Sequence, residues 1–504
     1  MQDTPASGSG IAGRRSAGSR PSLCPPLPPS HSSENEPRQP PARTSTNLHP
    51  GPWPVLNLPS RASVTNRAAN NKPWQSGPVP LGFTGCSGTN NAITIPGTIA
   101  GLPVRAIGDV AFYGYTSLTS VSVPEGVTSI GNNSFYGCTG LTRFIIPNSV
   151  TYVGERAFRR CRSLTSVTIG QSVRSIHNHA FAECIGLTSV IIPDTVTFIG
   201  EEAFAQCYSL AGVTIGTGVT SIEVRTFYAC ENLTRVTIPD QVTAIGGMAF
   251  YACKSLTSVA IGKSVTSIAD EAFRYCTSLT SITIPENITS IGTGAFDRCE
   301  SLVSVTLPHS ITSIGVGLFS NCTSLTSVTL PDSITSIGIS AFYGCPGLTN
   351  VVLPSSVISI GYDAFRYCAS LTSATFKGNA PSSFGSNVFS DSAPGFAIQY
   401  YEGSSGFTSP TWNGYPAVAL SRPPQPTVEL KVKSFTRTGE TVTVTAGDGL
   451  RGWIYELQRI GNLDVIPWVT VATVPPLAVA GLVELTDTTA SAPQALYRVV
   501  GHAP

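Results

Sequence analysis

Residues 272–291 read AFRYCTSLTSITIPENITSI, and this stretch decides the fold. Ile282 and Ile284 alternate with small polar residues, which is the pattern of a strand with one buried side. Pro285 lacks a backbone donor and therefore ends the strand. The apolar residues at the start of the stretch are spaced like one helical turn that faces inward. One unit is thus predicted to contain a strand, a bend, a short second extended piece and a helical turn.

The same stretch recurs with a period of 23 residues through most of the chain. A phenylalanine marks each copy, and a leucine always follows it six residues later. One unit buries too few apolar side chains to offset the conformational entropy lost in ordering it, so the units must stack as the coils of a solenoid. The residue after the strand alternates between Pro and Gly from Pro147 to Pro285, which indicates growth by the copying of paired units. The marking residues are Phe112, Phe135, Phe158, Phe181, Phe204, Phe227, Phe250, Phe273, Phe296, Phe319, Phe342 and Phe365.

The pattern C-x-x-L-x-x-V-x-I-P, which begins at Cys276 and ends at Pro285, resembles the leucine-rich repeat. Its continuation, S-x-T-S-I-G-x-x-A-F-x-x-C, resembles the BspA-type bacterial subclass of that family. The resemblance implies a leucine-rich repeat solenoid with parallel strands. Members of the subclass are mostly secreted or cell-surface proteins that adhere to other proteins or cells. The resemblance therefore implies an extracellular or cell-surface location, although no apolar segment of a secretory signal is visible near the start of this chain.

Composition excludes several function classes. Lys and Arg number 30 against 29 acidic residues, so no net field would recruit nucleic acid or an anionic membrane. Apolar residues never run long enough to span a bilayer. Nothing resembles a nucleophile elbow, a phosphate loop or a convergent pair of carboxylates. We therefore expect a monomer without enzymatic activity or a cofactor.

Eleven of the 13 cysteines lie 23 residues apart, from Cys138 to Cys368. Stacked side chains at one position point the same way at a spacing of about 4.8 Å, whereas a disulfide needs two Cβ atoms that face each other at about 3.5–4.5 Å. We interpret the column as buried free thiols that act as small apolar fillers. A ladder of disulfides or metal sites is the alternative, against which the odd count and the lack of C-x-x-C spacing both weigh.

The domain organisation follows from changes in pattern. Residues 1–77 are rich in Pro, Ser and Arg and are predicted to be disordered. The solenoid is predicted over 78–380, a capping coil over 381–421 and a Pro-rich linker over 422–426. Residues 427–504 alternate strongly and predict a small β-sandwich of immunoglobulin or fibronectin-III type.

Both ends of the array require a cover. Residues 91–108 read NAITIPGTIAGLPVRAIG, a unit with five extra residues, which we interpret as the opening coil. Residues 81–89 are predicted to cover the first open strand edge. At the other end, Tyr400, Tyr401 and Trp412 are predicted to close the core.

Two sets of residues are candidates for binding. Outward residues of the predicted strands form hydroxyl columns, either as a plain soluble strand surface or as a regular surface for glycan or protein contact. An ice-binding array is a remote alternative, because Ile145, Ile191, Ala260 and Val352 interrupt the Thr column. Arginines in neighbouring units form a basic cluster, either partly paired with Glu155 and Glu183 or open to an acidic or glycan partner. The candidates are Ser281, Thr283, Ser304, Thr306, Ser327, Thr329, Arg143, Arg156, Arg159, Arg160, Arg162 and Arg174.

Tyrosines recur one or two residues after the column phenylalanines, either as packing over the helical turns or as contact hot spots. The residues His177, His179, Glu183 and Cys184 resemble a set of metal ligands. Because Cys184 belongs to the core column and His177 replaces the usual Gly, we expect no metal there. The tyrosines are Tyr113, Tyr136, Tyr228, Tyr251, Tyr275, Tyr343 and Tyr367.

Taken together, the sequence predicts a non-enzymatic cell-surface or secreted recognition protein that binds another protein or a glycan through the solenoid surface. The alternative is a structural stalk or matrix component that uses the array only for length.

Overall fold

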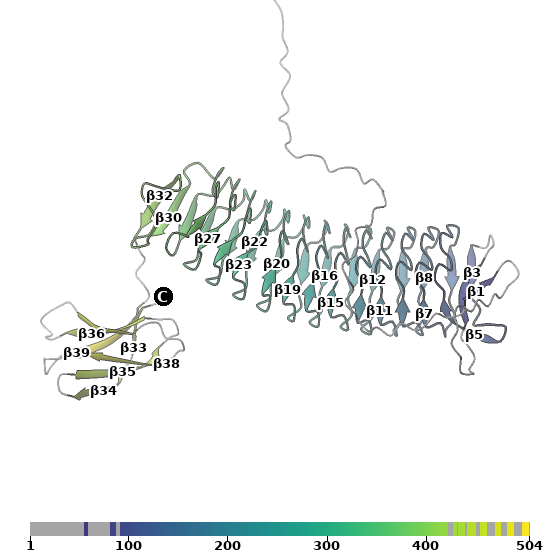
Figure 1. Cartoon of the computed structure of the whole chain (residues 1–504), viewed down its shortest axis with the longest axis horizontal. Coiled ribbons are helices and arrows are strands. Elements are labelled where there is room, and N and C mark those ends of the chain that lie inside the picture. The colour runs from purple at the N-terminus through teal and green to yellow at the C-terminus, as the bar shows by residue number, and fades with distance from the viewer. Residues whose placement is uncertain are drawn as a thin grey trace, which may run out of the picture. The chain divides into compact units, whose positions relative to one another are not determined.

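The computed structural model describes residues 91–421 in full, and the backbone of β1 (Val55–Leu58), β2 (Leu81–Cys86) and seven strands between residues 427 and 502. Residues 91–421 form a parallel β-solenoid of about 14 coils that stack side by side (Figure 1). The leucine-rich repeat solenoid predicted from the sequence is thereby confirmed. Most coils contribute one strand to each of two rows.

The first row consists of three- to six-residue strands that pair in parallel with the strand one coil away. The register is regular, since Val167 of one strand pairs with Phe144 of the preceding strand, 23 residues earlier. The strands are β3 (Ala92–Thr94), β6 (Ser120–Ser122), β8 (Arg143–Ile145), β10 (Ser166–Thr168), β12 (Ser189–Ile191), β14 (Gly212–Thr214), β16 (Arg235–Thr237), β18 (Ser258–Ala260), β20 (Ser281–Thr283), β22 (Ser304–Thr306), β24 (Ser327–Thr329), β26 (Asn350–Leu353), β28 (Ser373–Phe376), β30 (Ala397–Tyr401) and β32 (Tyr415–Leu420).

The second row begins with the longer strand β5 and continues as two-residue strands, each after the turn that follows a first-row strand. These are the short second extended pieces that the sequence predicts. They are β5 (Leu102–Ile107), β7 (Ser129–Ile130), β9 (Tyr152–Val153), β11 (Ser175–Ile176), β13 (Phe198–Ile199), β15 (Ser221–Ile222), β17 (Ala244–Ile245), β19 (Ser267–Ile268), β21 (Ser290–Ile291), β23 (Ser313–Ile314), β25 (Ser336–Ile337), β27 (Ser359–Ile360) and β29 (Ser383–Phe384).

At the N-terminal end, β4 (Thr98–Ile99) folds back on β5 within the opening coil. Strand β2 pairs in parallel with β5, so it covers the edge of the second row as predicted. Strand β1 pairs in parallel with β2 in turn. Strand β1 lies within residues 1–77, for which the sequence predicts disorder, and that disorder stays a prediction. The rest of that range lies outside the described residues.

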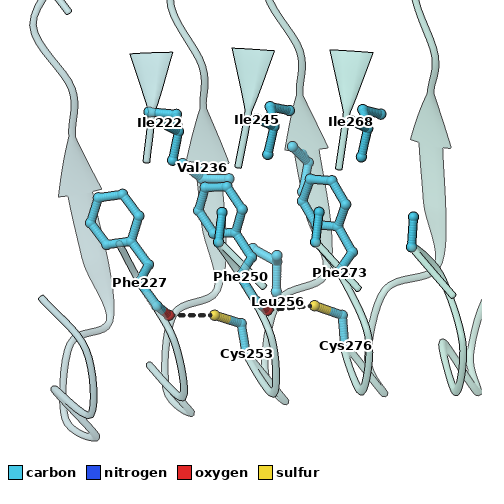
Figure 2. Packing of buried hydrophobic residues seen from close by; sticks show 14 of the residues in the cluster. Ile222, Phe227, Val236, Ile245, Phe250, Cys253, Leu256, Ile268, Phe273 and Cys276 are labelled. Carbon is cyan, nitrogen blue, oxygen red and sulfur yellow. Dashed lines mark hydrogen bonds between the residues drawn. The ribbon is translucent and has the colours of Figure 1, made fainter. Parts of the chain in front are cut away.

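The core is a set of stacked columns in which equivalent residues of successive coils touch. The rings of Phe250 and Phe273 stack with centroids 5.3 Å apart and an interplanar angle of 2° (Figure 2). Leu256 and Cys253 are fully buried beside them. Each coil thus covers the apolar edge of its neighbour, which a single unit could not do alone.

The predicted helical turn is wrong, since the described residues contain no α-helix. The segment around each column phenylalanine is a run of turns in which two residues four positions apart are left-handed, such as Met248 with φ 54° and Ala252 with φ 55°. The amide of Phe250 donates to the Ala272 carbonyl of the next coil at 2.8 Å, rather than to a residue four positions back. The apolar spacing defines only which residues face inward, and both conformations satisfy it.

These turns align three peptide groups per coil along the stacking direction. The amides of Met248, Phe250 and Ala252 all donate to the following coil. Other amides of the same coil, such as those of Thr243 and Thr257, donate to the preceding coil, and their dipoles oppose these three. The three rows end with N–H donors at the C-terminal end of the solenoid. There the amide of Phe389 donates to the Tyr415 hydroxyl at 3.1 Å, which closes the middle row.

The glycines that follow the first-row strands pack closely against the preceding coil. A Cβ placed on Gly216 would lie 2.3 Å from the carbonyl oxygen of Pro193 in the preceding coil. Gly170 and Gly262 face the same obstacle at Pro147 and Pro239. Prolines also follow one another at this position in successive coils, as Pro285, Pro308 and Pro331 do, so the close approach belongs to the glycine coils and does not by itself explain the alternation.

Aromatic residues close the C-terminal end of the solenoid. β31 (Thr411–Trp412) forms a hairpin with β32. Trp412 is buried against Phe384, with ring centroids 4.7 Å apart, and its indole nitrogen donates to the Gly406 carbonyl at 2.8 Å. Tyr400 is buried as well, whereas Tyr401 is half-buried.

Beyond the solenoid, seven strands form two antiparallel sheets. The all-β character predicted for 427–504 is present in the backbone, while the packing of one sheet on the other lies outside the described side chains, so the sandwich stays a prediction. One sheet has the order β33-β39-β36-β37 and the other β34-β35-β38. The strands are β33 (Thr427–Leu430), β34 (Val432–Thr438), β35 (Thr441–Gly449), β36 (Ile454–Ile460), β37 (Val469–Val474), β38 (Gly481–Asp487) and β39 (Leu496–His502).

Candidate recognition surfaces

The predicted hydroxyl columns lie on the outer side of the first strand row. In β20, β22 and β24, serines pair in register with serines and threonines with threonines, and all six side chains are exposed. They are Ser281, Ser304, Ser327, Thr283, Thr306 and Thr329. The structure therefore brings these candidates together as two straight columns.

The same side carries exposed apolar residues further along the row. Ile145 and Ile191 are 66% and 68% exposed, and Thr168 lies in register next to Ile145. Val352 interrupts the column near its other end with 45% exposure. The uniform array of threonines that ice binding requires is therefore limited to a few coils.

A further threonine column, one residue after most of the column leucines, has a structural role that sequence reasoning missed. The hydroxyl of Thr257 donates to the carbonyl of Thr234 at 3.0 Å, and Thr280 donates to Thr257 at 3.3 Å. Each hydroxyl thus ties a coil to the preceding one. The signal in the sequence was the constancy of threonine at this position, which solubility alone does not explain.

Tyrosine and arginine side chains gather on the turn segments. The rings of Tyr228 and Tyr251 stack at 5.1 Å, and Tyr251 meets Tyr275 edge-on at 5.4 Å. The guanidinium carbons of Arg274 and Arg298 lie 5.1 and 5.3 Å from the centre of the Tyr275 ring, within the range of cation–π attraction. We call this set the turn ribbon; it comprises Tyr113, Tyr136, Arg160, Arg225, Tyr228, Tyr251, Arg274, Tyr275, Arg298, Tyr343, Arg366 and Tyr367.

Acidic residues hold several of these arginines in place. Arg274 pairs with Glu271 at 2.8 Å and with Asp297 at 2.9 Å. Arg225 pairs with Glu202 at 3.3 Å. Arg225 and Arg274 are thus oriented between aromatic faces and carboxylates before any partner arrives.

The six candidate arginines do not form one patch. Arg159 and Arg160 meet at Glu183, each with a nitrogen 2.9 Å from one of its oxygens. Burial alone would raise the pKa of the Glu183 carboxyl, but hydrogen bonds from Arg160 and Arg159 outweigh burial and lower the pKa below its ordinary value.

The remaining four arginines lie elsewhere on the coils. Arg156 pairs with the neighbouring Glu155 at 3.4 Å. Arg143 begins strand β8 in the first row and is exposed. Arg174 precedes strand β11 in the second row, and Arg162 follows the turn segment; both are exposed. Of the six candidate arginines, only Arg159 and Arg160 therefore share a partner.

The four candidate metal ligands have different partners. Cys184 is fully buried and donates its thiol to the Phe158 carbonyl, while Glu183 holds the two arginines. His179 lies 3.1 Å from Glu202, and the ring of His177 contacts aromatic side chains. Within the described ranges, no group of His, Cys, Asp and Glu side chains is arranged to hold a metal ion.

The eleven column cysteines are free, buried thiols, as the sequence predicted. They also have a polar role, because each donates to the carbonyl of the phenylalanine 26 residues earlier, as Cys253 does to Phe227 at 3.3 Å (Figure 2). Burial raises the pKa of the Cys253 thiol to about 12. The thiolate, which is the reactive form, is therefore suppressed in the folded chain.

In the described part of the chain, no helix is long and apolar enough to cross a membrane. A sequence model of the BspA type leucine rich repeat region matches six times, over residues 82–211, 199–325 and 289–395. Comparison with curated proteins gives no match.

Solved structures of bacterial repeat proteins are similar to this chain. A leucine-rich repeat protein from Bacteroides ovatus is 26% identical with a TM-score of 0.55, and the match covers 71% of this chain and all 100% of that one. A leucine rich cell surface protein from Faecalibacterium prausnitzii is 33% identical with a TM-score of 0.43, over 62% of this chain and 97% of that one. The matched repeats span most of residues 82–395, and the chain belongs to the BspA-type leucine-rich repeat family.

Proposed function

We propose that the chain is a non-enzymatic recognition protein, secreted or displayed at a cell surface, that binds a protein partner through the turn ribbon. The observation that carries this proposal is three groups of stacked tyrosines and arginines along the turn segments, of which the central one spans Arg225 to Arg298. The family supports it in general terms, because BspA-type leucine-rich repeat proteins are typically bacterial surface proteins with roles in protein interaction or adhesion.

The composition of the turn ribbon is that of a contact hot spot. Tyrosine and arginine are enriched among the residues that dominate protein interfaces, since each offers a large apolar body and a polar end. Tyr113 and Tyr367 are 56% and 42% exposed, so their rings remain available to a partner. A partner with acidic and apolar side chains would match the guanidinium groups and the rings together.

Variation between coils also favours the turn side. The residue directly after each column phenylalanine is Tyr, Arg, Ala, Asp or Ser in different coils. On the strand side, Ser and Thr recur in most coils. Specificity requires differences between positions, so a near-uniform strand surface discriminates poorly between partners.

At the centre of the turn ribbon, the side chain of Arg274 is held in place before a partner binds. Arg274 already contacts Glu271, Asp297 and the Tyr275 ring. A side chain that is held in place loses less entropy on binding. The charged end of Arg274 is therefore presented at a lower entropic cost than that of a free surface arginine.

The test compares matched variants of the full chain. Immobilised protein is offered detergent-free extracts of surface proteins from neighbouring cells, and saturable binding is measured as a function of extract concentration. Replacing Tyr228, Tyr251 and Tyr275 by Ser is expected to weaken binding about tenfold or more. Replacing Ser281, Thr283 and Thr306 by Ala is the control on the strand side and should leave binding unchanged.

Two results would contradict the proposal. If wild-type protein retains no saturable partner, the array serves only as a structural stalk. If the strand-side control loses binding and the turn-ribbon variant does not, the partner binds to the hydroxyl columns instead.

A further inference from the structure

Three aromatic rings form a row on the outer side of the second strand row. They belong to Tyr152 in β9, His177 just after β11, and Phe198 in β13. The Tyr152 and His177 ring centroids are 4.5 Å apart, and those of His177 and Phe198 are 5.4 Å apart. The row is separate from the turn ribbon.

The way the rings meet follows from strand register. Ser175 lies in register between Tyr152 and Phe198. Alternate residues of an extended chain point to the same side, so His177 follows Ser175 on that side. Because the Ser175 side chain is small, the imidazole of His177 occupies the space between the Tyr152 and Phe198 rings.

The three residues are departures from the repeat and are not needed by the core. Val153, Ile176 and Ile199 supply the buried side of these strands and are at most 1% exposed. In nine other coils the position of Tyr152 and Phe198 is a serine, and the same core forms without a ring. Those serines are Ser129, Ser175, Ser221, Ser267, Ser290, Ser313, Ser336, Ser359 and Ser383.

The position of His177 is likewise glycine in the adjacent coils, namely Gly154 and Gly200. Phe198 remains 38% exposed, and Tyr152 and His177 are half-buried. Three consecutive coils have thus replaced small residues by rings that the fold does not require and that stay partly in water. A ligand that covers the rings would remove this apolar area from water.

Two carboxylates act on the Tyr152 end of the row. Burial raises the pKa of the Tyr152 phenol, and the charges of Asp109 and Glu155 raise the pKa further. Asp109 is fixed in place because one of its oxygens accepts from the Asn132 amide at 2.7 Å. Arg174 is exposed directly before β11. The carboxylates of Asp109 and Glu155 therefore supply hydrogen-bond acceptors at this end of the row.

Size and backbone pairing argue against a protein as the occupant. A stable protein interface takes about 800 Å² from each partner, whereas an aromatic side chain contributes about 150–250 Å² even when it is wholly covered. These rings already cover part of one another. Strand β9 pairs with β7 and β11, and β11 pairs with β9 and β13, so neither offers a free edge to which a peptide strand could add. Strand β13 pairs with β11 and has β15 of the next coil against its other side.

We propose that Tyr152, His177 and Phe198 form a binding subsite for a neutral oligosaccharide. The C–H faces of pyranose rings would lie on the aromatic rings, and their hydroxyls would bond to the carboxylates of Asp109 and Glu155. The row follows the stacking direction of the coils, so an extended sugar chain laid along it meets each ring in turn. The subsite does not depend on the proposed protein contact of the turn ribbon.

The experiment reverts the three residues to those of the other coils. The full chain and its Tyr152→Ser, His177→Gly, Phe198→Ser triple variant are titrated calorimetrically with cellopentaose, maltopentaose, xylopentaose and mannopentaose. At least one of these probes should bind the wild-type protein, and the triple variant should bind it about tenfold more weakly or less. Because the new residues are those of neighbouring coils, thermal unfolding should show that the variant is folded.

Control variants distinguish the sugar subsite from the proposed protein contact of the turn ribbon. Tyr362→Ser removes a ring that is 50% exposed on a distant coil and should leave the sugar affinity unchanged. The Tyr228, Tyr251 and Tyr275 variant should also keep it. No binding of any probe at up to ~10 mM, or equal affinity in the triple variant, would overturn the proposal. Loss of a protein partner in the triple variant, without sugar binding, would assign the row to a protein and overturn it as well.

Discussion

Raising the pH should unfold the solenoid, because its buried thiols must stay protonated in the folded chain. Burial raises the pKa of Cys207 and Cys253 from 9.0 to about 12, and the pKa values of Cys138 and Cys368 are raised equally. A folded-state pKa above that of the unfolded chain means that the folded chain binds more protons. The stability from these thiols is therefore fully present below pH 9 and is lost as the pH rises toward 12.

The magnitude follows from the size of the shift. Each pKa unit corresponds to about 1.36 kcal/mol, so three units remove about 4 kcal/mol per thiol above pH 12. At pH 10 each of the four thiols lowers the free energy of unfolding by about 1.4 kcal/mol, or about 6 kcal/mol together. Domains are commonly stable by about 5–15 kcal/mol, so we expect the strands to be lost between about pH 9 and 11.

The assay follows far-ultraviolet circular dichroism and thiolate absorbance in one pH titration. Both signals should change in the same transition, because the thiols ionise only when the coils open. A Cys207→Ala, Cys253→Ala variant should show a shallower dependence of stability on pH, by about 2.7 kcal/mol per pH unit between pH 9 and 12. Thiolate absorbance that rises near pH 9 while the strands remain intact would refute the reasoning.

Three further predictions concern packing and the end of the array. Phe250→Ala should lower the free energy of unfolding by about 3–5 kcal/mol in urea titrations, because it empties a site in the ring column. Gly216→Ala should cost about 1–3 kcal/mol, whereas Gly212→Ala, with no atom within 4 Å of the added Cβ, should be far milder in the same assay. Tyr415→Phe removes the acceptor of the Phe389 amide and should cost about 1–3 kcal/mol; faster hydrogen exchange at that amide checks it.

Much of the fold could be predicted from spacing alone. Residues at one position of a 23-residue repeat must lie over one another once the units stack, so the burial of the Phe and Cys columns follows from sequence. The alternation around Ile282 and Ile284 likewise defined the strand and its outward hydroxyls. These features depend on which side of the chain is apolar, which a sequence displays directly.

The conformation of the turn segments could not be predicted in this way. The amide of Phe250 bonds to the carbonyl of Ala272, which comes within reach only after the next coil has stacked. The threonine ties and the thiol donors are of the same kind, since their acceptors belong to other coils. The spacing of apolar residues within one coil cannot distinguish a helical hydrogen bond to the residue four positions back from a hydrogen bond to the neighbouring coil.

The sequence by itself thus determined the stack, its core columns and the sides that face water. Only the tertiary structure decided that Arg159 and Arg160 share Glu183, that tyrosines and arginines interleave on the turns, and that Tyr152, His177 and Phe198 meet. The physical reason is that a repeat period places residues in neighbouring coils at the same height, whereas contact depends on the direction and length of each side chain.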